Sequence, residues 1–284
     1  MKLSREILTS RSNPTVKWAS SLSNKKTRQN EKSFIAEGKK LTLEALDARA
    51  PVSHIFVAEN KREELLLALG AYLNLEEYKD TEILTVSESV FEKISTEKSP
   101  EGIISVIKYF DTIKIKYLDI LNNTDIIYKE EFFLGESERA RVLYSVRDPG
   151  NLGAVIRSAT AFGVDHIIVT SDSADVYNHK TVRAAMGSLF RTKITVVQRL
   201  DAFIRDARSF GRRVFAAELT DGAVEISSLG LSPKDIFIIG NEGHGIAPEI
   251  SALCDRSAYI PISKKTESLN AAVAAAILMW EQSK

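Results

Sequence analysis

The C-terminal half of the chain alternates short apolar runs with segments of helical periodicity, and this alternation restricts the folds that it can adopt. The apolar runs span residues 141–146, 167–170, 195–197, 214–217 and 236–240, and the helical segments span 152–162, 181–189, 202–210 and 268–281. The runs are short and uninterrupted, as expected for strands that are buried on both faces. The sequence therefore predicts an α/β domain with a mostly parallel sheet that helices cover on both sides.

Three apolar runs lead into polar loops. Residues 142–146 lead into 147–153, residues 236–240 lead into 241–245, and a further run at 259–262 leads into 268–270. Ligands of parallel sheets bind at the carboxyl ends of the strands. We therefore expect the three loops to meet and to form one small-molecule site, built largely from main-chain groups.

Each of these polar residues also has a simpler structural interpretation. The turn 148–153 could bind a phosphate before a helix, but its glycine spacing does not match G-x-G-x-x-G, which argues against a Rossmann dehydrogenase. Taken singly, Arg157 is typical of a surface arginine, and Glu242 could cap the helix that begins at Pro248. Ser268 is a candidate N-cap of the last helix.

The first 108 residues have the pattern of a smaller α/β unit. Helices are predicted at 39–50, 63–75 and 87–94, and strands at 54–58, 83–86 and 102–107. Residues 109–140 differ, because charged residues and asparagines cluster there and periodicity is weak. We predict an N-terminal domain at 1–108, a linker or insertion at 109–140 and a C-terminal domain at 141–284.

Charge is balanced over the whole chain but not along it. Lys and Arg number 38, as do Asp and Glu, whereas residues 1–40 hold ten basic and three acidic residues. Such a basic stretch suits contacts with nucleic-acid phosphates. A solvated helical face is an equally good interpretation of this feature alone.

Other classes of chemistry find little support. One cysteine, Cys254, cannot form an intrachain disulfide, and four scattered histidines without companions at ligand spacing predict no metal site. No apolar run approaches the length of about 20 residues that spans a bilayer, and the N-terminus lacks the pattern of a signal peptide. We therefore expect a cytoplasmic protein without a membrane partner.

Three motifs in the C-terminal half occur in a distinctive order. The first is Asn151-x-Gly153-x-x-x-Arg157, the second spans 239–245 and contains Glu242, and the third is 260–262 followed by 268–270. Together they resemble the motifs of SpoU (TrmH-type) RNA ribose methyltransferases, which include bacterial 23S rRNA enzymes. Residues 10–14, 34–38 and 99–103 are similar to that family's substrate-binding domain, although the stretch 110–140 is longer than its usual interdomain connection.

The resemblance implies transfer of a methyl group from S-adenosylmethionine to a ribose 2′-hydroxyl of RNA, most simply ribosomal RNA. It also implies a trefoil knot, which pattern reading alone would not propose because threaded chains are rare. The family's cofactor-binding positions correspond here to Leu219, Thr220, Gly240, Ile260, Ile262, Leu269 and Asn270. A tRNA methyltransferase and a catalytically silent ribosome-assembly factor are the alternatives, and methylation that confers antibiotic resistance falls within the leading class.

The same resemblance assigns catalytic roles. Asn151 and Arg157 match the catalytic pair, Glu242 is expected to orient one of them, and Ser268 and Asn270 to shape the methionine end of the cofactor site. Because a guanidinium stays protonated at physiological pH, we expect Arg157 to bind the target phosphate and stabilise the developing alkoxide.

The resemblance further implies a homodimer through the catalytic domain, in which Arg157 serves the neighbouring subunit's site. The last predicted helix supports this expectation, because it carries an apolar stripe that is wider than one covered side requires. The stripe comprises Leu269, Val273, Ala276, Ile277 and Trp280.

Overall fold

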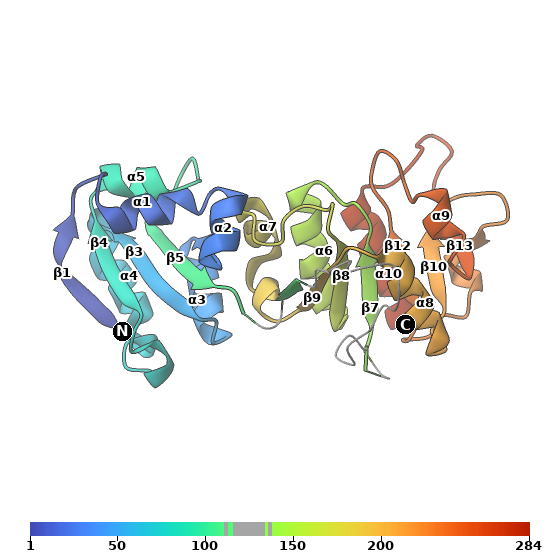
Figure 1. The fold of residues 1–284 in the computed structure, drawn as a ribbon, viewed down its shortest axis with the longest axis horizontal. Helices are drawn as coiled ribbons and strands as arrows, with labels where there is room; N and C mark the ends of the chain where they lie inside the picture. Colours follow the sequence, from blue (N-terminus) through green and yellow to red (C-terminus); the bar gives the residue numbers. More distant parts are fainter. Residues whose placement is uncertain (111–112, 116–133, 136–137) are drawn as a thin grey trace, which may run out of the picture. The chain divides into compact units, whose positions relative to one another are not determined.

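The computed structural model describes residues 1–110, 113–115, 134–135 and 138–284, and the chain divides into two compact units. Unit 1 comprises Met1–Asp111 and Asp175–Arg191, and unit 2 comprises Thr112–Ala174 and Thr192–Lys284 (Figure 1). Most of the predicted insertion at 109–140 lies outside the described residues. Residues 175–191, which the sequence pattern assigned to the C-terminal domain, pack within unit 1.

Unit 1 is built on a five-stranded mixed sheet. Its strands are, in spatial order, β1 (Lys2–Leu8), β4 (Glu82–Val86), β3 (Val52–Ala58), β5 (Ile103–Lys108) and β2 (Ser33–Glu37). The first three run parallel, whereas β5 is antiparallel to both of its neighbours. The helices are α1 (Pro14–Ser21), α2 (Lys25–Glu31), α3 (Lys39–Asp47), α4 (Arg62–Leu69) and α5 (Glu88–Ile94).

The predicted strands and helices between residues 39 and 107 are present, with α4 ending earlier than predicted. The elements β1, α1, α2 and β2 were not predicted. Side-chain caps explain the two helices: Asn13 accepts hydrogen bonds from the first turn of α1, and Asn24 does so for α2. Such caps stabilise helices that lack a strong apolar stripe.

Residues 175–191 form α7 (His179–Ala185) and the short 3₁₀ helix η5 (Met186–Phe190). The Tyr177 ring stacks on Tyr109 with centroids 3.8 Å apart and packs against Phe34. Arg28, with 3% of its side chain exposed, forms an ion pair with Asp175 at 2.5 Å and donates hydrogen bonds to two backbone carbonyls. The segment therefore completes the core of unit 1.

Unit 2 contains an eight-stranded sheet in which every described pairing is parallel, as predicted. The spatial order is β11 (Val224–Glu225), β13 (Arg256–Tyr259), β10 (Val214–Ala217), β12 (Ile236–Ile239), β7 (Ala140–Leu143), β8 (His166–Thr170), β9 (Lys193–Val197) and β6 (Ile113–Ile115). The short edge strands β6 and β11 were not predicted. The run 259–262 is not a strand of its own, because β13 begins earlier and ends at Tyr259, two residues before Pro261, whose missing N–H cannot continue the ladder.

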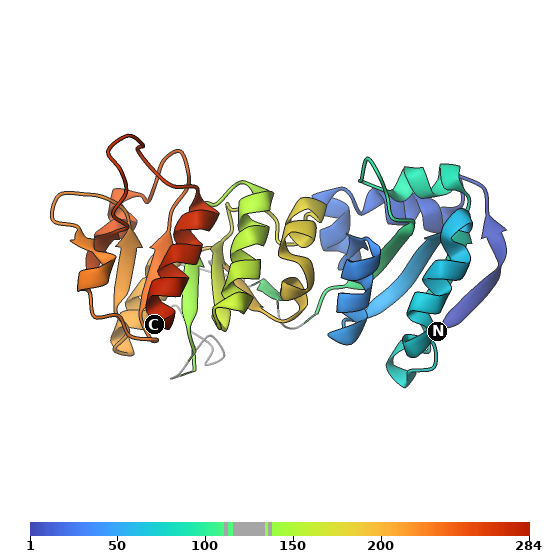
Figure 2. The same cartoon turned by 180° about the vertical axis from the view of Figure 1, so that it is seen from behind.

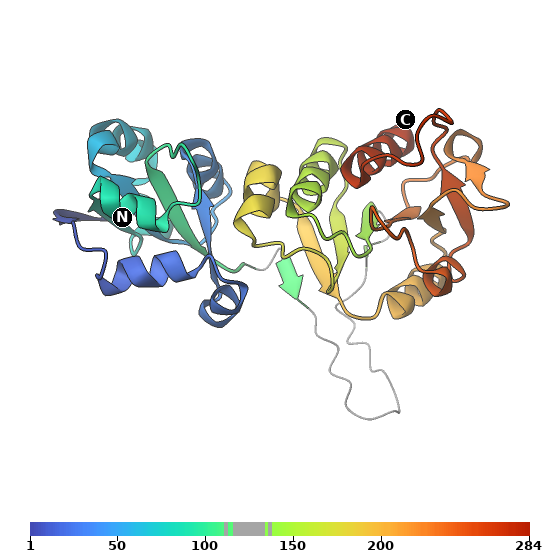
Figure 3. The same ribbon diagram turned by 90° about the horizontal axis from the view of Figure 1, so that it is seen from above.

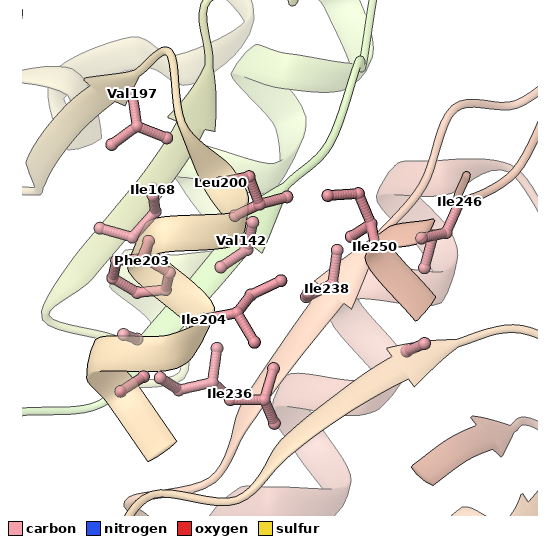
Figure 4. Packing of buried hydrophobic residues seen from close by; sticks show 14 residues of the cluster. Val142, Ile168, Val197, Leu200, Phe203, Ile204, Ile236, Ile238, Ile246 and Ile250 are labelled. Carbon is pink, nitrogen blue, oxygen red and sulfur yellow. The ribbon is translucent and has the colours of Figure 1, made fainter. Parts of the chain in front are cut away.

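Helices cover both faces of this sheet. Figure 3 shows α6 (Pro149–Ala161) and α10 (Ala271–Ser283) on one face and α8 (Leu200–Ser209) on the other, and Figure 2 shows α10 beside α6. Phe203 and Ile204 of α8 pack on strand residues such as Val142, and Ile250 of α9 (Pro248–Ser251) joins the same cluster (Figure 4). The short apolar strands are thus buried on both sides.

Two predicted helix starts are wrong, and side-chain caps explain both. Helix α6 begins at Pro149, so the predicted turn 148–153 is mostly its first turn, and the Asp148 carboxylate accepts a hydrogen bond from the Asn151 N–H at 2.7 Å. Helix α10 begins at Ala271 with Asn270 as its N-cap, so Ser268 does not cap it.

The buried ion pair between Arg28 and Asp175 should be necessary for the stability of unit 1. Replacing one partner leaves a charge buried without compensation, so Arg28→Ala should lower the free energy of unfolding by about 3–5 kcal/mol. The measurement is urea unfolding followed by Trp18 fluorescence in a Trp280→Phe background, since the chain has two tryptophans. Lys26→Ala, which removes an exposed cation of the same helix, is the control, and an equal effect of both changes would contradict the prediction.

Candidate active site

A cavity of about 300 Å³ lies at the carboxyl ends of β10, β12 and β13. Leu219, Gly240, Ile260, Ile262 and Leu269, all predicted as cofactor-binding residues, line it. Two other predicted positions, Thr220 and Asn270, are sequence neighbours of lining residues. The remaining lining residues are Ala217, Glu218, Ile239, Asn241, Glu242, Gly245, Ala258, Tyr259, Glu267, Ser268, Ala271 and Ala274.

The loop after β12 forms one wall of the cavity through a very close backbone approach. A Cβ atom added to Gly240 would lie 2.6 Å from the carbonyl carbon of Gly245. Asn241 and Gly245 exchange two backbone hydrogen bonds, of 3.1 and 2.9 Å. Only glycine at residue 240 permits this loop to fold back on itself.

Asn241 organises the same loop with its side chain. Its Oδ1 accepts hydrogen bonds from the N–H groups of Gly243 and His244, and its Nδ2 donates to the Ser145 carbonyl at 2.7 Å. Asn241 was not among the predicted site residues, although an asparagine two residues before a glycine is typical of such a side-chain turn. Asn241 therefore joins the loop after β12 to the loop after β7.

The loop after β7 is itself held in place. Ser145 has a φ of 55°, and its N–H donates to the Thr170 hydroxyl at 2.8 Å. Burial opposes ionisation of nearby Asp172, yet hydrogen bonds from the Thr170 and Ser145 hydroxyls keep the pKa of its carboxyl below the ordinary value. The ionised Asp172 carboxylate therefore holds the Thr170 hydroxyl in place, and this hydroxyl accepts the hydrogen bond from the Ser145 N–H.

Glu218 connects the end of β10 to two neighbouring segments. Its Oε1 accepts hydrogen bonds from the hydroxyls of Ser251, in α9, and Ser257, in β13, the latter at 2.7 Å. Burial raises the pKa of the nearby Cys254 thiol to about 12, which disfavours its thiolate form. No sequence pattern indicates the role of Glu218, because its hydroxyl partners lie more than thirty residues away.

Three of the predicted catalytic residues meet at the rim of the cavity. Asn151 donates from Nδ2 to Oε1 of Glu242 at 2.5 Å, and Asn270 donates from Nδ2 to Oδ1 of Asn151 at 2.9 Å. Ser268 lines the cavity but forms no side-chain hydrogen bond with these three. The first turn of α6, the loop after β12 and the start of α10 thus supply one polar cluster.

Arg157 does not join this cluster. It lies six residues after Asn151 on α6, which places it about 240° around the helix and about 9 Å along its axis. Its side chain is exposed and forms no hydrogen bond or ion pair with any described residue. The Arg157 side chain is therefore available for interactions outside this cluster.

A cavity and a polar cluster at the carboxyl ends of a parallel sheet define a small-molecule site, and sequence comparison assigns the class. Residues 140–280 match the SpoU rRNA Methylase family, and residues 13–105 match the MRM3-like substrate binding domain. The chain belongs to the SpoU rRNA methylase family.

Individual relatives support this assignment over nearly the whole chain. It is 30% identical to the 23S rRNA (guanosine(2553)-2'-O)-methyltransferase RlmP of Bacillus subtilis, with 94% of this chain and 95% of that protein covered. It is 26% identical to the 23S rRNA (uridine(2479)-2'-O)-methyltransferase of Streptomyces viridochromogenes, with 96% and 90% covered. The crystal structure of an AdoMet-bound rRNA methyltransferase from Sinorhizobium meliloti superposes with a TM-score of 0.76 at 30% identity, covering 98% of this chain and 97% of that one.

The described residues hold neither a candidate membrane span nor a candidate metal-binding cluster. They contain no helix that is both long and apolar enough to cross a membrane. They also contain no group of three or more His, Cys, Asp or Glu side chains arranged to hold a metal ion.

Gly240→Ala tests whether the close approach at residue 240 builds the cavity. The added Cβ would collide with backbone, so the loop 241–245 should be displaced and the affinity for S-adenosylmethionine should fall at least tenfold, about 1.4 kcal/mol. Calorimetry gives the affinity, and thermal unfolding checks that the variant is folded. Gly70→Ala, in unit 1, is the control for a glycine that has neither close neighbours nor a positive φ, and unchanged affinity in Gly240→Ala would show that the loop does not shape the site.

Proposed function

We propose that this protein transfers the methyl group of S-adenosylmethionine to a ribose 2′-hydroxyl of 23S ribosomal RNA. The observation that carries the proposal is the polar cluster of Asn151, Glu242 and Asn270 at the rim of the cavity. The cavity provides a cofactor site, and the cluster provides hydrogen-bonding groups for a hydroxyl beside it. The 23S rRNA substrate is inferred from the two relatives described above, which are both 23S rRNA 2′-O-methyltransferases.

The residues that line the cavity suit S-adenosylmethionine. Apolar side chains such as Leu219 and Ile260 can cover an adenine ring, while exposed backbone groups of the loops read its edge. The carboxylates of Glu218, Glu242 and Glu267 lie in the lining, and no Lys or Arg does, which fits a ligand with a sulfonium and an ammonium group. When bound, the cofactor supplies an electrophilic methyl carbon, and the chain must align a hydroxyl with it.

Unit 1, which contains the predicted domain at 1–108 together with residues 175–191, is the proposed RNA-binding part, and unit 2 is the proposed methyltransferase part. Support comes from the match to a substrate-binding domain and from exposed cations such as Lys25 and Lys26 of α2. Neither lysine forms an ion pair with a described residue, so both are available for phosphates. An rRNA substrate would place the protein in the cytoplasm.

The trefoil knot is expected from the family. The strand order is compatible with a knot. Strand β13 lies next to β10, on the side away from β12, and the chain then returns through α10, which packs on α6 and β12. Such a return path is necessary for threading, and we include the knot in the proposal on the strength of family membership.

We further propose a homodimer in which Arg157 reaches the neighbouring subunit's site. On α10, Val273 and Trp280 are 48% and 54% exposed, which leaves an apolar face uncovered beside α6. Arg157 forms no hydrogen bond or ion pair with the three clustered site residues of its own chain, although it belongs to the same motif as Asn151. A partner packed on α6 and α10 would resolve both observations.

Methyl transfer to ribose can be measured directly. Purified protein, tritiated S-adenosylmethionine and 23S rRNA transcribed in vitro should yield label at one nucleotide, in a dinucleotide resistant to alkali because its 2′-oxygen is blocked. A tRNA transcript mixture serves as the control. Labelling of tRNA alone would contradict the assigned substrate, and labelling of neither RNA despite cofactor binding would favour a silent binding protein.

Mixed dimers test whether Arg157 acts across the interface. Arg157→Ala and Asn151→Ala should each lose about a hundredfold or more in transfer rate, the scale of a lost oxyanion-stabilising donor. If Arg157 serves the other subunit, random mixing should restore about a quarter of wild-type activity, because half of the dimers are then mixed and each of these has one complete site. Light scattering checks the dimer. Activity no higher than that of the separate variants would place Arg157 in its own subunit's site or outside catalysis.

A further inference from the structure

The N-terminus of α10 fixes the orientation of the Asn270 side chain. Its Oδ1 accepts hydrogen bonds from the backbone N–H groups of Ala272 and Val273, at 2.9 and 3.3 Å. A carboxamide has one oxygen and one NH₂ group, and a backbone N–H can only donate. The Asn270 Nδ2 must therefore point away from the helix, toward Asn151.

The orientation of Asn151 follows from that of Asn270. Since the Asn270 Nδ2 can only donate, the group that it meets at 2.9 Å must be the Asn151 oxygen. The Asn151 Nδ2 then faces Glu242 and donates to its Oε1 at 2.5 Å. The donors run in one direction, from the helix end through two amides to a carboxylate.

This direction leaves the carboxylate as the proton-accepting end of the chain of hydrogen bonds. An amide does not take up a proton at physiological pH, and neither does the guanidinium of Arg157. The second oxygen of Glu242, Oε2, accepts no hydrogen bond from a described residue, and Glu242 lines the cavity. Among the residues assigned to catalysis, Glu242 is thus the one with a free atom that can accept a proton.

We propose that Glu242 is the proton acceptor of the reaction, an inference that rests on the proposed function. Asn151 and Asn270 are then positioning residues that orient the free oxygen of Glu242. As the ribose oxygen bonds to the methyl carbon, the sulfur–carbon bond breaks, the sulfonium becomes a neutral thioether, and the hydroxyl proton passes to Glu242 Oε2. No strong base is required, because the attacking hydroxyl becomes very acidic once it bonds to carbon. Placement of the acceptor, rather than its basicity, governs the rate.

The chain of hydrogen bonds also explains why the positioning residues are amides. Asn151 must accept on one side and donate on the other, and neither a carboxylate nor a hydrocarbon side chain can do both. Asn270 must accept from a helix end and donate to Asn151. Each amide holds the next group, and the last group held is the carboxylate.

Glu242→Gln is the decisive variant, because its amide oxygen can still accept the Asn151 hydrogen bond while its free end becomes a donor. Single-turnover methyl transfer to the 23S rRNA transcript should fall by about 10²–10⁴, the usual contribution of a placed general base. Because one of the three lining carboxylates loses its charge, calorimetric affinity for S-adenosylmethionine should fall, but by less than tenfold, about 1.4 kcal/mol. Transfer is therefore compared at saturating cofactor, and the melting temperature should be preserved. Glu249→Gln, an equal charge change on the exposed face of α9, should retain wild-type transfer.

Chemical rescue separates a proton acceptor from a structural carboxylate. Formate, a small carboxylate, should restore transfer by Glu242→Ala in proportion to its concentration, and it should not restore Asn151→Ala. Wild-type transfer by Glu242→Gln, or failure of formate to rescue Glu242→Ala, would overturn the proposal. Absence of methyl transfer by the wild-type protein would instead refute the proposed function.

Discussion

The functional half of the molecule depends on the contact between the backbones of Gly240 and Gly245. This contact folds the loop after β12 onto itself, and the fold has two effects. It exposes backbone groups along one wall of the cavity, and it turns Glu242 toward the first turn of α6. Asn241 fastens the folded loop to Ser145 at the end of the adjacent strand. A single residue without a side chain therefore determines both where a cofactor can lie and where the acidic end of the polar cluster stands.

Sequence patterns were sufficient for strands β7, β8, β9, β10 and β12 of unit 2 and for the meeting of the loops, but they missed the edge strands β6 and β11 and misplaced β13. Short apolar runs indicate strands buried on both faces, and parallel strands bring their carboxyl ends to one edge. The same patterns misplaced the starts of α6 and α10. The first residue of each helix is determined by the hydrogen bond that its N-cap side chain accepts, and the periodicity of apolar residues contains no information about that hydrogen bond. Ser268 and Asn270 are both good capping residues, and only the three-dimensional contact between Asn270 and Asn151 shows why the second is used.

Unit 1 was harder to predict, because its N-terminal elements are held by interactions between distant residues. The seven residues of α2 include no large apolar side chain, so periodicity cannot reveal the helix. Its cap is Asn24, and its inward anchor is Arg28, whose carboxylate partner lies 147 residues later in the chain. The family matches do not follow the boundary between the two units. The substrate-binding match ends at residue 105, whereas the α7 segment that completes unit 1 falls within the methylase match.

Unit 1 is built from two chain segments that residues 112–174 separate, and this separation delays its folding during synthesis. Because residues 175–191 belong to its core, unit 1 cannot finish folding when residue 111 leaves the ribosome, but only about 80 residues later. At roughly 5–20 residues per second this delay lasts about 4–16 seconds, during which Arg28 lacks its counter-charge and Phe34 and Tyr109 lack the Tyr177 ring. A nascent chain in this state exposes aromatic surface that the Tyr177 ring covers in the folded unit. Unit 1 can therefore finish folding only after residues 112–174 of unit 2 have been synthesised, although each unit has a sheet of its own.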